Sequence, residues 1–201
     1  NIRQIFIMYN EISRFIRSLY PENESIPLHE PDLAGNEAEY LLNCVQIGFV
    51  SYMGEYVVQF EEQLKKYFDI PYAVAMNSGT SALHIALICL GIKKNDEIIT
   101  QSLSFVATGN AIAYTGAHPC FIDVDEETLS LSPSKLEDFL KNQTVQKNGV
   151  TYNKITNRRL AACIPMHTFG LAASMDQIIE ICTKYNIPVI EDAAESVGTT
   201  Y

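Results

Sequence analysis

The sequence is poor in basic residues and contains no long apolar run. Lys and Arg number 14 against 24 Asp and Glu, so the formal net charge is −10. A surplus of acid argues against a general nucleic-acid or acidic-membrane surface, although a local site can still hold a small anion. No apolar stretch approaches the about 18 residues of a membrane span. We therefore predict a cytoplasmic protein with neither nucleic acid nor membrane as a partner.

Paired cysteines and the common phosphate-binding motifs are also absent. The five cysteines are widely spaced in apolar stretches and form no C-x-x-C pair. This pattern is typical of buried, reduced thiols. Neither G-x-G-x-x-G nor G-K-[ST] occurs, which excludes the dinucleotide fingerprint and the P-loop. Any phosphate site must therefore be built in another way.

The first 70 residues are predicted to be helical. Five apolar residues at helical spacing predict an amphipathic packing helix, and interrupting charges argue against a signal peptide; they are Ile5, Ile12, Phe15, Ile16 and Leu19. Residues 26–31 are expected to be extended, since each proline restricts its predecessor. Asn36 and Glu39 predict a capped helix that Gly48 ends. A loop with Ser51 and Tyr52 precedes another helix, at 55–68.

From residue 71 onward, strand-like and helical patterns alternate. Strands are predicted at 72–76, 97–100, 119–122, 160–164 and 188–190, and helices at 80–90, 105–114, 133–140 and 175–185. The polar stretch 142–159 interrupts this rhythm and is interpreted as a surface excursion or small hairpin. Strict alternation is typical of a doubly wound α/β domain, with a mostly parallel sheet and helices on both faces.

Polar and aromatic residues follow the carboxyl ends of the predicted strands. Ligands of open α/β sheets bind at this edge, so we expect these residues to converge there; they are Asn77 to Ser81, Gln101 to Phe105, Asp123 and Asp125, Met166 to Gly170, and Asp192 and Glu195.

Several of these residues have both a functional and a structural interpretation. Gly79, Thr80 and Ser81 open an apolar helix whose free amides suit an anion, but they also fit an ordinary capped helix start. Phe105 could stack on a flat ring or belong to the core. His167 could bind a ligand, support Asp192 or be structural.

Two further groups of carboxylates follow strands. We interpret Asp123 and Asp125 as turn residues and predict no metal. Glu191 and Asp192 are adjacent, so only one of them can point into a given crevice. A buried Asp192 needs a cation. Pyridoxal 5′-phosphate (PLP) has a phosphate, a flat ring and a cationic nitrogen that together suit these sites.

Four segments, in this order, resemble the sugar aminotransferases of the DegT/DnrJ/EryC1/StrS type; they are Asn77-Ser-Gly-Thr-Ser-Ala-Leu-His84, Ser104-Phe-Val-Ala-Thr108, Met166-His-Thr-Phe-Gly170 and Glu191-Asp-Ala-Ala-Glu195. The N-terminal segment and the last motif look most similar to the branch that aminates keto-sugar nucleotides for legionaminic-type surface sugars. On this resemblance, residues 71–201 are the N-terminal part of a fold-type I PLP-binding large domain.

The resemblance implies a homodimer that uses glutamate as the amino donor and a nucleotide-linked keto-deoxysugar as the acceptor. It implies that Gly79 and Thr80, with Ser81, hold the cofactor phosphate and that Phe105 stacks on the ring. Asp192 would pair with the ring nitrogen, Glu195 would lie near the ring hydroxyl, and His167 is expected nearby. Family members often carry Gln where Glu195 stands.

The family's Schiff-base lysine follows the Asp strand, and no lysine of this sequence fits that position. Lys184 precedes the strand and Lys154 lies in the excursion, so we expect the lysine beyond Tyr201 and the chain to be a fragment. Two alternatives stay open: a sugar dehydratase with histidine in place of the lysine, and a non-catalytic binding protein. Ser51 and Tyr52 are predicted to line the substrate side.

Overall fold

The computed structural model describes residues 2–22, 24–27 and 30–200, with side chains from residue 7 onward. The chain divides into two compact units, Asn1–Ala75 and Met76–Tyr201. The predicted extended segment at 26–31 falls partly outside the described residues, because Leu28 and His29 are not among them.

The described residues of the first unit form the helices α1 (Ile2–Leu19), α2 (Glu37–Ile47) and α3 (Glu55–Phe68), as predicted. Gly48 ends α2 with a φ of +77°, in the left-handed region that glycine tolerates best. The predicted side-chain cap by Asn36 is wrong. Its φ of −92° and ψ of 12° are not the extended geometry of a capping residue, and no side-chain cap hydrogen bond forms.

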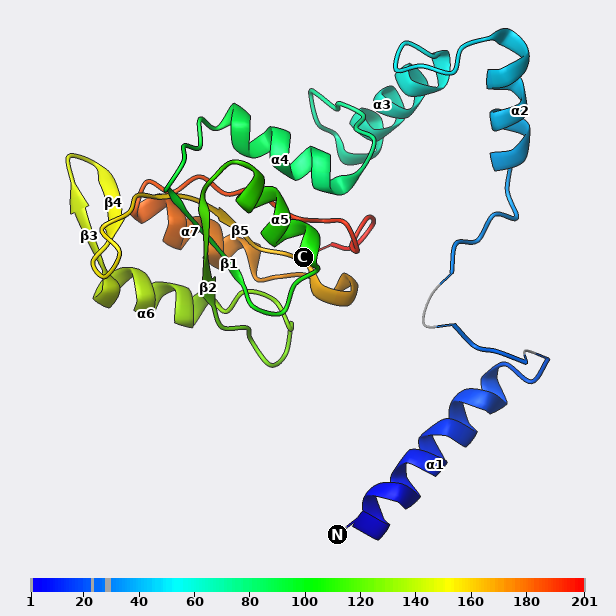
Figure 1. Ribbon diagram of the computed structural model, residues 1–201, viewed down its shortest axis with the longest axis horizontal. Coiled ribbons are helices and arrows are strands. Elements are labelled where there is room, and N and C mark those ends of the chain that lie inside the picture. Colours follow the sequence, from blue (N-terminus) through cyan, green and yellow to red (C-terminus); the bar gives the residue numbers. More distant parts are fainter. Residues whose placement is uncertain (1, 23, 28–29, 201) are drawn as a thin grey trace. The chain divides into compact units, whose positions relative to one another are not determined.

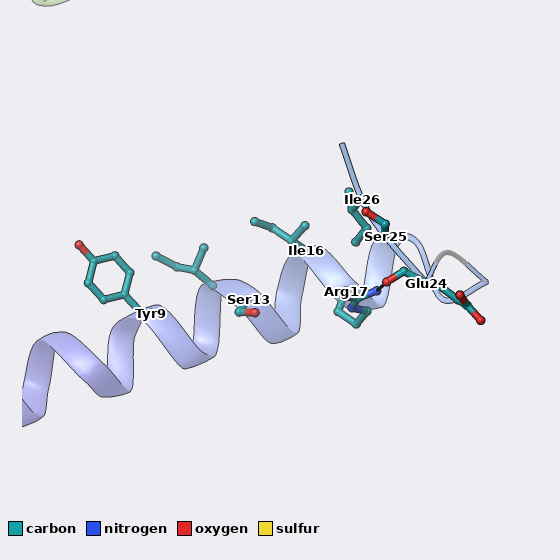
Figure 2. Close-up of a pocket in the computed structure, with 8 residues that line it drawn as sticks. Tyr9, Ser13, Ile16, Arg17, Glu24, Ser25 and Ile26 are labelled. Carbon is teal, nitrogen blue, oxygen red and sulfur yellow. Dashed lines mark hydrogen bonds between the residues drawn. The ribbon is translucent and has the colours of Figure 1, made fainter. Parts of the chain in front are cut away.

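The apolar side of α1 is exposed, so the surface against which this predicted packing helix lies stays a prediction. Ile12, Phe15 and Leu19 are 47%, 64% and 57% exposed. A groove of about 640 Å³ runs along α1 between Tyr9 and Ile26 (Figure 2), and it contains none of the predicted cofactor residues. In the part of the chain that the structure describes, no helix is both long and apolar enough to cross a membrane.

The second unit is a parallel sheet with helices on both faces (Figure 1). Its elements are α4 (Gly79–Cys89), β1 (Glu97–Gln101), α5 (Val106–Tyr114), β2 (His118–Ile122), α6 (Pro133–Gln143), β3 (Thr144–Lys147), β4 (Val150–Asn153), β5 (Leu160–Ile164), the 3-10 turn η1 (Thr168–Gly170) and α7 (Met175–Lys184). The sheet order is β2-β1-β5, with β1 parallel to both neighbours. The predicted fold class is therefore confirmed.

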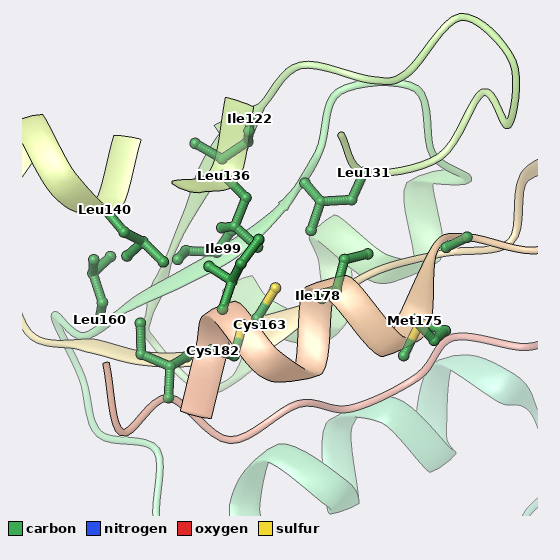
Figure 3. Close-up of a cluster of buried hydrophobic side chains, with 13 residues drawn as sticks. Ile99, Ile122, Leu131, Leu136, Leu140, Leu160, Cys163, Met175, Ile178 and Cys182 are labelled. Atoms are coloured by element: carbon green, nitrogen blue, oxygen red, sulfur yellow. The ribbon is translucent and has the colours of Figure 1, made fainter. Parts of the chain in front are cut away.

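Two hydrophobic clusters hold the sheet between its helices. Figure 3 shows the first, in which Ile99 and Cys163 pack against α6 and α7. On the other face, Ile98 and Ile164 pack against Leu83 of α4 and Ile112 of α5. Adjacent strand residues enter opposite clusters because side chains alternate along a strand. Burial on both faces explains why the middle of β1 and the whole of β5 are apolar.

Two of the predicted strands differ from the prediction. Residues 188–190 lie beside β5, to which an isolated parallel bridge joins Val189 at Cys163, and a second bridge just beyond both segments joins Met166 and Asp192. The segment 72–76 is not a strand. An apolar run favours extended backbone but does not supply a neighbouring strand, and Tyr72 and Val74 are 83% and 77% exposed.

The polar interruption is a hairpin, as one of the two interpretations predicted. Strands β3 and β4 pair in antiparallel register. Asn148 and Gly149 join them with φ values of +52° and +77°. Two left-handed residues form the type I′ turn that suits a two-residue hairpin loop.

The five cysteines are unpaired, but they are not all buried as predicted. Cys89, near the end of α4, is exposed, whereas Cys163 and Cys182 are buried. Burial, with a smaller contribution from Glu97, raises the pKa of Cys120 to about 12. Hydrogen bonding with Cys182, followed by burial, raises the pKa of Cys163.

These differences predict the order of alkylation by iodoacetamide at pH 8. Because the thiolate is the reactive form, a pKa four units above the pH leaves roughly one Cys120 in 10,000 reactive. We expect Cys89 to be labelled first, and Cys120 and Cys163 only after denaturation, as measured by peptide mass spectrometry. Labelling of Cys120 as fast as Cys89 in the native protein would contradict this packing of β2.

Candidate active site

The candidate site lies at the carboxyl edge of the sheet, where the chain changes direction. From β1 the chain crosses to β2 on one side, and it returns to β5 on the other side of β1. The loops after β1 and β5 therefore leave the sheet next to each other, which is the position where open α/β sheets bind ligands. The first turns of α4 and α5 lie at this same end of the sheet (Figure 1).

Asp192 is a buried carboxylate at this edge, only 6% exposed. Its backbone amide donates to Pro165 O at 2.9 Å, and its carbonyl accepts from His167 N at 3.2 Å. Its Oδ2 accepts a hydrogen bond of 2.7 Å from Oγ1 of Thr108. The segment after residue 190 is thus held against β5, and its carboxylate faces α5.

Glu191 and Asp192 have different partners, as the alternation of side chains predicts. Oε1 of Glu191 lies 2.7 Å from Nε2 of His167. Nδ1 of His167 accepts from the backbone amide of Ala173 at 2.9 Å, so Nε2 carries the ring proton and donates it to Glu191. His167 therefore connects the loop after β5 to the segment that carries Asp192.

The first turn of α4 has the geometry of an anion site. Ser78 is its N-cap, and Oγ of Ser78 accepts from the amide of Ser81 at 3.2 Å. The amides of Gly79 and Thr80 precede the first intrahelical hydrogen bond, which runs from Ala82 N to Ser78 O. A Cβ added at Gly79 would meet nothing within 4 Å, so the backbone there is open to an approaching group.

Phe105 and Glu195 also lie at this edge. Phe105 is the residue before α5 and is 64% exposed, so the alternative that it belongs to the core is wrong. Its amide donates to the sulfur of Met166 at 3.3 Å. Oε2 of Glu195 accepts from the amide of Phe169 at 2.7 Å and so supports the turn after His167.

Gln101 and Thr108 are the two site residues to which the sequence assigned no role. Gln101 is fully buried at the end of β1, and its Oε1 accepts from the amides of Leu131 and Met166 at 2.8 and 3.0 Å. Its Nε2 donates to Leu103 O and Thr168 Oγ1 at 2.9 and 2.8 Å. A polar residue at the end of a strand was the available signal for Gln101, and the place of Thr108 at the end of the motif Ser104 to Thr108 was the available signal for that residue.

The remaining predicted residues make local hydrogen bonds or belong to the first unit. Oδ1 of Asp125 accepts from the amides of Glu127 and Thr128, which confirms it as a turn residue, whereas Oδ1 of Asp123 accepts from the adjacent amide of Val124. Ser51 and Tyr52 belong to the first unit, in the exposed loop between α2 and α3. Their predicted contact with substrate stays a prediction.

Comparison with known proteins yields one family and several related structures. The model of the DegT/DnrJ/EryC1/StrS aminotransferase family matches residues 31–201. GDP-perosamine synthase of Caulobacter vibrioides is 38% identical over 176 residues, which are 88% of this chain and 43% of that protein. The chain therefore spans less than half the length of this curated relative.

Two solved structures extend the comparison. The aminotransferase from Psychrobacter cryohalolentis superimposes with a TM-score of 0.73 at 30% identity, covering 87% of this chain and 41% of that chain. Escherichia coli GDP-4-keto-6-deoxy-D-mannose-3-dehydratase, solved with hydrated PLP bound, gives 0.72 at 26% identity, covering 88% and 43%. The site is built on the fold of these proteins, and the chain belongs to the DegT/DnrJ/EryC1/StrS aminotransferase family.

Proposed function

We propose that the protein to which this chain belongs is a PLP-dependent aminotransferase acting on a nucleotide-linked keto-deoxysugar. The observation that carries the proposal is the buried Asp192 carboxylate at the carboxyl edge of a parallel sheet. Family membership and the similarity to a GDP-perosamine synthase support it. Residues 71–201 would form the N-terminal part of the cofactor-binding large domain.

The residues present fit PLP. The cofactor's phosphate suits the amides of Gly79 and Thr80, with the hydroxyl of Ser81 beside them, because a helix N-terminus attracts anions. Its ring suits the exposed face of Phe105, and its ring nitrogen suits Asp192. When bound, PLP acts as an electron sink for an attached amine, provided that its ring nitrogen stays protonated.

Each residue of the chain would then have a separate task. Asp192 holds the proton on the ring nitrogen, Phe105 orients the ring, and the start of α4 anchors the phosphate. His167 and Glu195 act indirectly. His167 hydrogen-bonds to the side chain of Glu191, and Glu195 accepts from the amide of Phe169, so both stabilise the loops at the carboxyl edge of the sheet. The lysine that binds the cofactor covalently is proposed to follow Tyr201 in the sequence.

Three further assignments belong to the same proposal. Glutamate is the proposed amino donor, with the product entering surface polysaccharide or nonulosonic sugar synthesis of the legionaminic type. A homodimer is proposed because the first unit exposes many large apolar residues, Tyr52 and Leu41 among them, at 84% and 68%. A cytoplasmic location is supported by the five unpaired thiols.

A sugar dehydratase is the second candidate, since the E. coli dehydratase has a comparable TM-score. The two functions differ in the fate of the sugar's keto oxygen. In transamination the amino group of glutamate replaces that oxygen, which leaves as water, while water supplies the keto oxygen of the 2-oxoglutarate formed from glutamate. In dehydration the sugar loses water without forming an amino sugar.

The test uses the full-length protein with PLP, glutamate and GDP-4-keto-6-deoxy-D-mannose as a first acceptor. We expect 2-oxoglutarate and an amino sugar in equal amounts, measured by mass spectrometry of the nucleotide sugars. Because the acceptor is a proposal, other nucleotide-linked keto sugars are tested in parallel. A product that has lost water from the sugar and carries no amino group would support the dehydratase. Binding of PLP without turnover of any acceptor would support a non-catalytic protein.

A further inference from the structure

Thr108 donates the hydrogen bond that orients Asp192, although its position in a helix offers it a nearer acceptor. We propose that Thr108 is a positioning residue: its hydroxyl holds the Asp192 carboxylate so that a proton stays on the ring nitrogen of the bound cofactor. This inference rests on the proposed function, because it requires PLP at this site.

The direction of the hydrogen bonds is the first support. Oγ1 of Thr108 donates to Oδ2 of Asp192 at 2.7 Å and accepts from Oγ of Ser104 at 3.0 Å. Thr108 is the third residue of α5. A threonine in a helix can donate to the carbonyl three or four residues earlier, and the carbonyl of Phe105, three residues before Thr108, belongs to the first turn. Here the hydroxyl instead spans 84 positions of sequence to reach the carboxylate.

Burial is the second support. Thr108 is 0% exposed and Asp192 is 6% exposed, so water does not compete strongly for the bond. A hydrogen bond to an ionised group in such surroundings is among the stronger ones in proteins. The start of α5 also presents the positive end of its dipole to the carboxylate. The orientation of Asp192 is therefore set by α5.

The hydroxyl of Thr108 affects the cofactor through the orientation and the charge of the Asp192 carboxylate. With Oδ2 anchored, the carboxylate is fixed about its last torsion angle, and Oδ1 keeps one direction. Without the anchor, the carboxylate rotates, and its negative charge loses a stabilising donor. Rotation moves the carboxylate away from the proton on the ring nitrogen. Loss of the donor raises the proton affinity of the carboxylate, so the proton transfers to it more readily. Both effects lower the protonated fraction of the ring nitrogen.

A matched pair of substitutions separates the hydroxyl from the packing. Thr108→Val keeps the shape of the side chain and removes the hydroxyl, whereas Thr108→Ser keeps the hydroxyl and removes a methyl group. The probe is pyridoxamine 5′-phosphate labelled with ¹⁵N in the ring, which binds without a covalent bond to lysine. The ¹⁵N chemical shift reports directly whether the ring nitrogen carries a proton.

In the full-length parent protein and in Thr108→Ser, we expect the bound probe to show the protonated ring nitrogen across neutral pH. In Thr108→Val, we expect the resonance at pH 7 to move toward the position of the unprotonated ring. The ratio of protonated to unprotonated ring is expected to fall at least about tenfold, which corresponds to one unit in the pKa of the ring nitrogen. Should the valine variant fail to fold, Thr108→Ala removes the same hydroxyl without apolar bulk and is measured in its place.

The outcomes are distinguishable. A parent resonance that Thr108→Val leaves unchanged would overturn the role of Thr108 and leave the proposed function intact. Equal shifts in the valine and serine variants would assign the effect to packing and also overturn it. A parent protein that does not bind the probe would overturn the proposed function, and this inference with it.

Discussion

Replacing Asp192 with asparagine is expected to lower the transamination rate of the full-length protein by about a hundredfold. Asparagine is nearly isosteric, so the substitution removes the negative charge and little else. A carboxylate at about 3 Å from a ring cation is worth up to about 5 kcal/mol at an effective dielectric constant of about 20. Even half of this energy corresponds to about two pKa units on the ring nitrogen.

The measurement is the single-turnover rate with glutamate, followed through the absorbance of the bound cofactor. Asp123→Asn is the matched control, because Asp123 also follows a strand of the sheet but is exposed and accepts from the adjacent amide of Val124. We expect the control to stay within about twofold of the parent, as for a surface change away from the site. An Asp192→Asn variant that keeps the parent rate would remove the main support for the proposed function.

Replacing Gln101 with leucine is expected to cost about 3 kcal/mol of the free energy of unfolding. The side chain is fully buried, and its Oε1 is the acceptor for the amides of Leu131 and Met166. Leucine fills a similar volume but accepts no hydrogen bond. Each amide left buried without an acceptor costs about 1 to 3 kcal/mol.

Urea denaturation of the full-length protein measures this loss as a lower transition midpoint with an unchanged slope. Gln146→Leu is the control, since Gln146 is exposed on β3. A change within about 0.5 kcal/mol is expected for that surface position. A Gln101→Leu variant as stable as the control would show that the two amides find other acceptors.

The α/β fold and most element bounds were predictable from the sequence, because they depend on local patterns. The strand-like runs at 97–100 and 160–164 correspond to strands buried on both faces, and α6 begins with Ser132 as its N-cap and Pro133 as its first residue. The strand predicted at 72–76 failed for a non-local reason. A strand requires a neighbour, and no local pattern of one segment supplies it.

The identity of the main site residue was also accessible from the sequence. Asp192 follows an apolar segment and precedes small residues, and a buried carboxylate in that position calls for a cation. The family motifs pointed to the same residue. Strand alternation further predicted that Glu191 and Asp192 would face different partners, and the hydrogen bonds of His167 and Thr108 agree with it.

What only the tertiary structure decided is how Asp192 is held. Thr108 lies 84 positions from Asp192, and Gln101 lies 65 positions from Met166. The sheet order β2-β1-β5 brings these residues together, and order is a property of the whole chain. Sequence patterns therefore determined which residue carries the charge, while the packing of α5 and β1 against the loop after β5 determined its orientation.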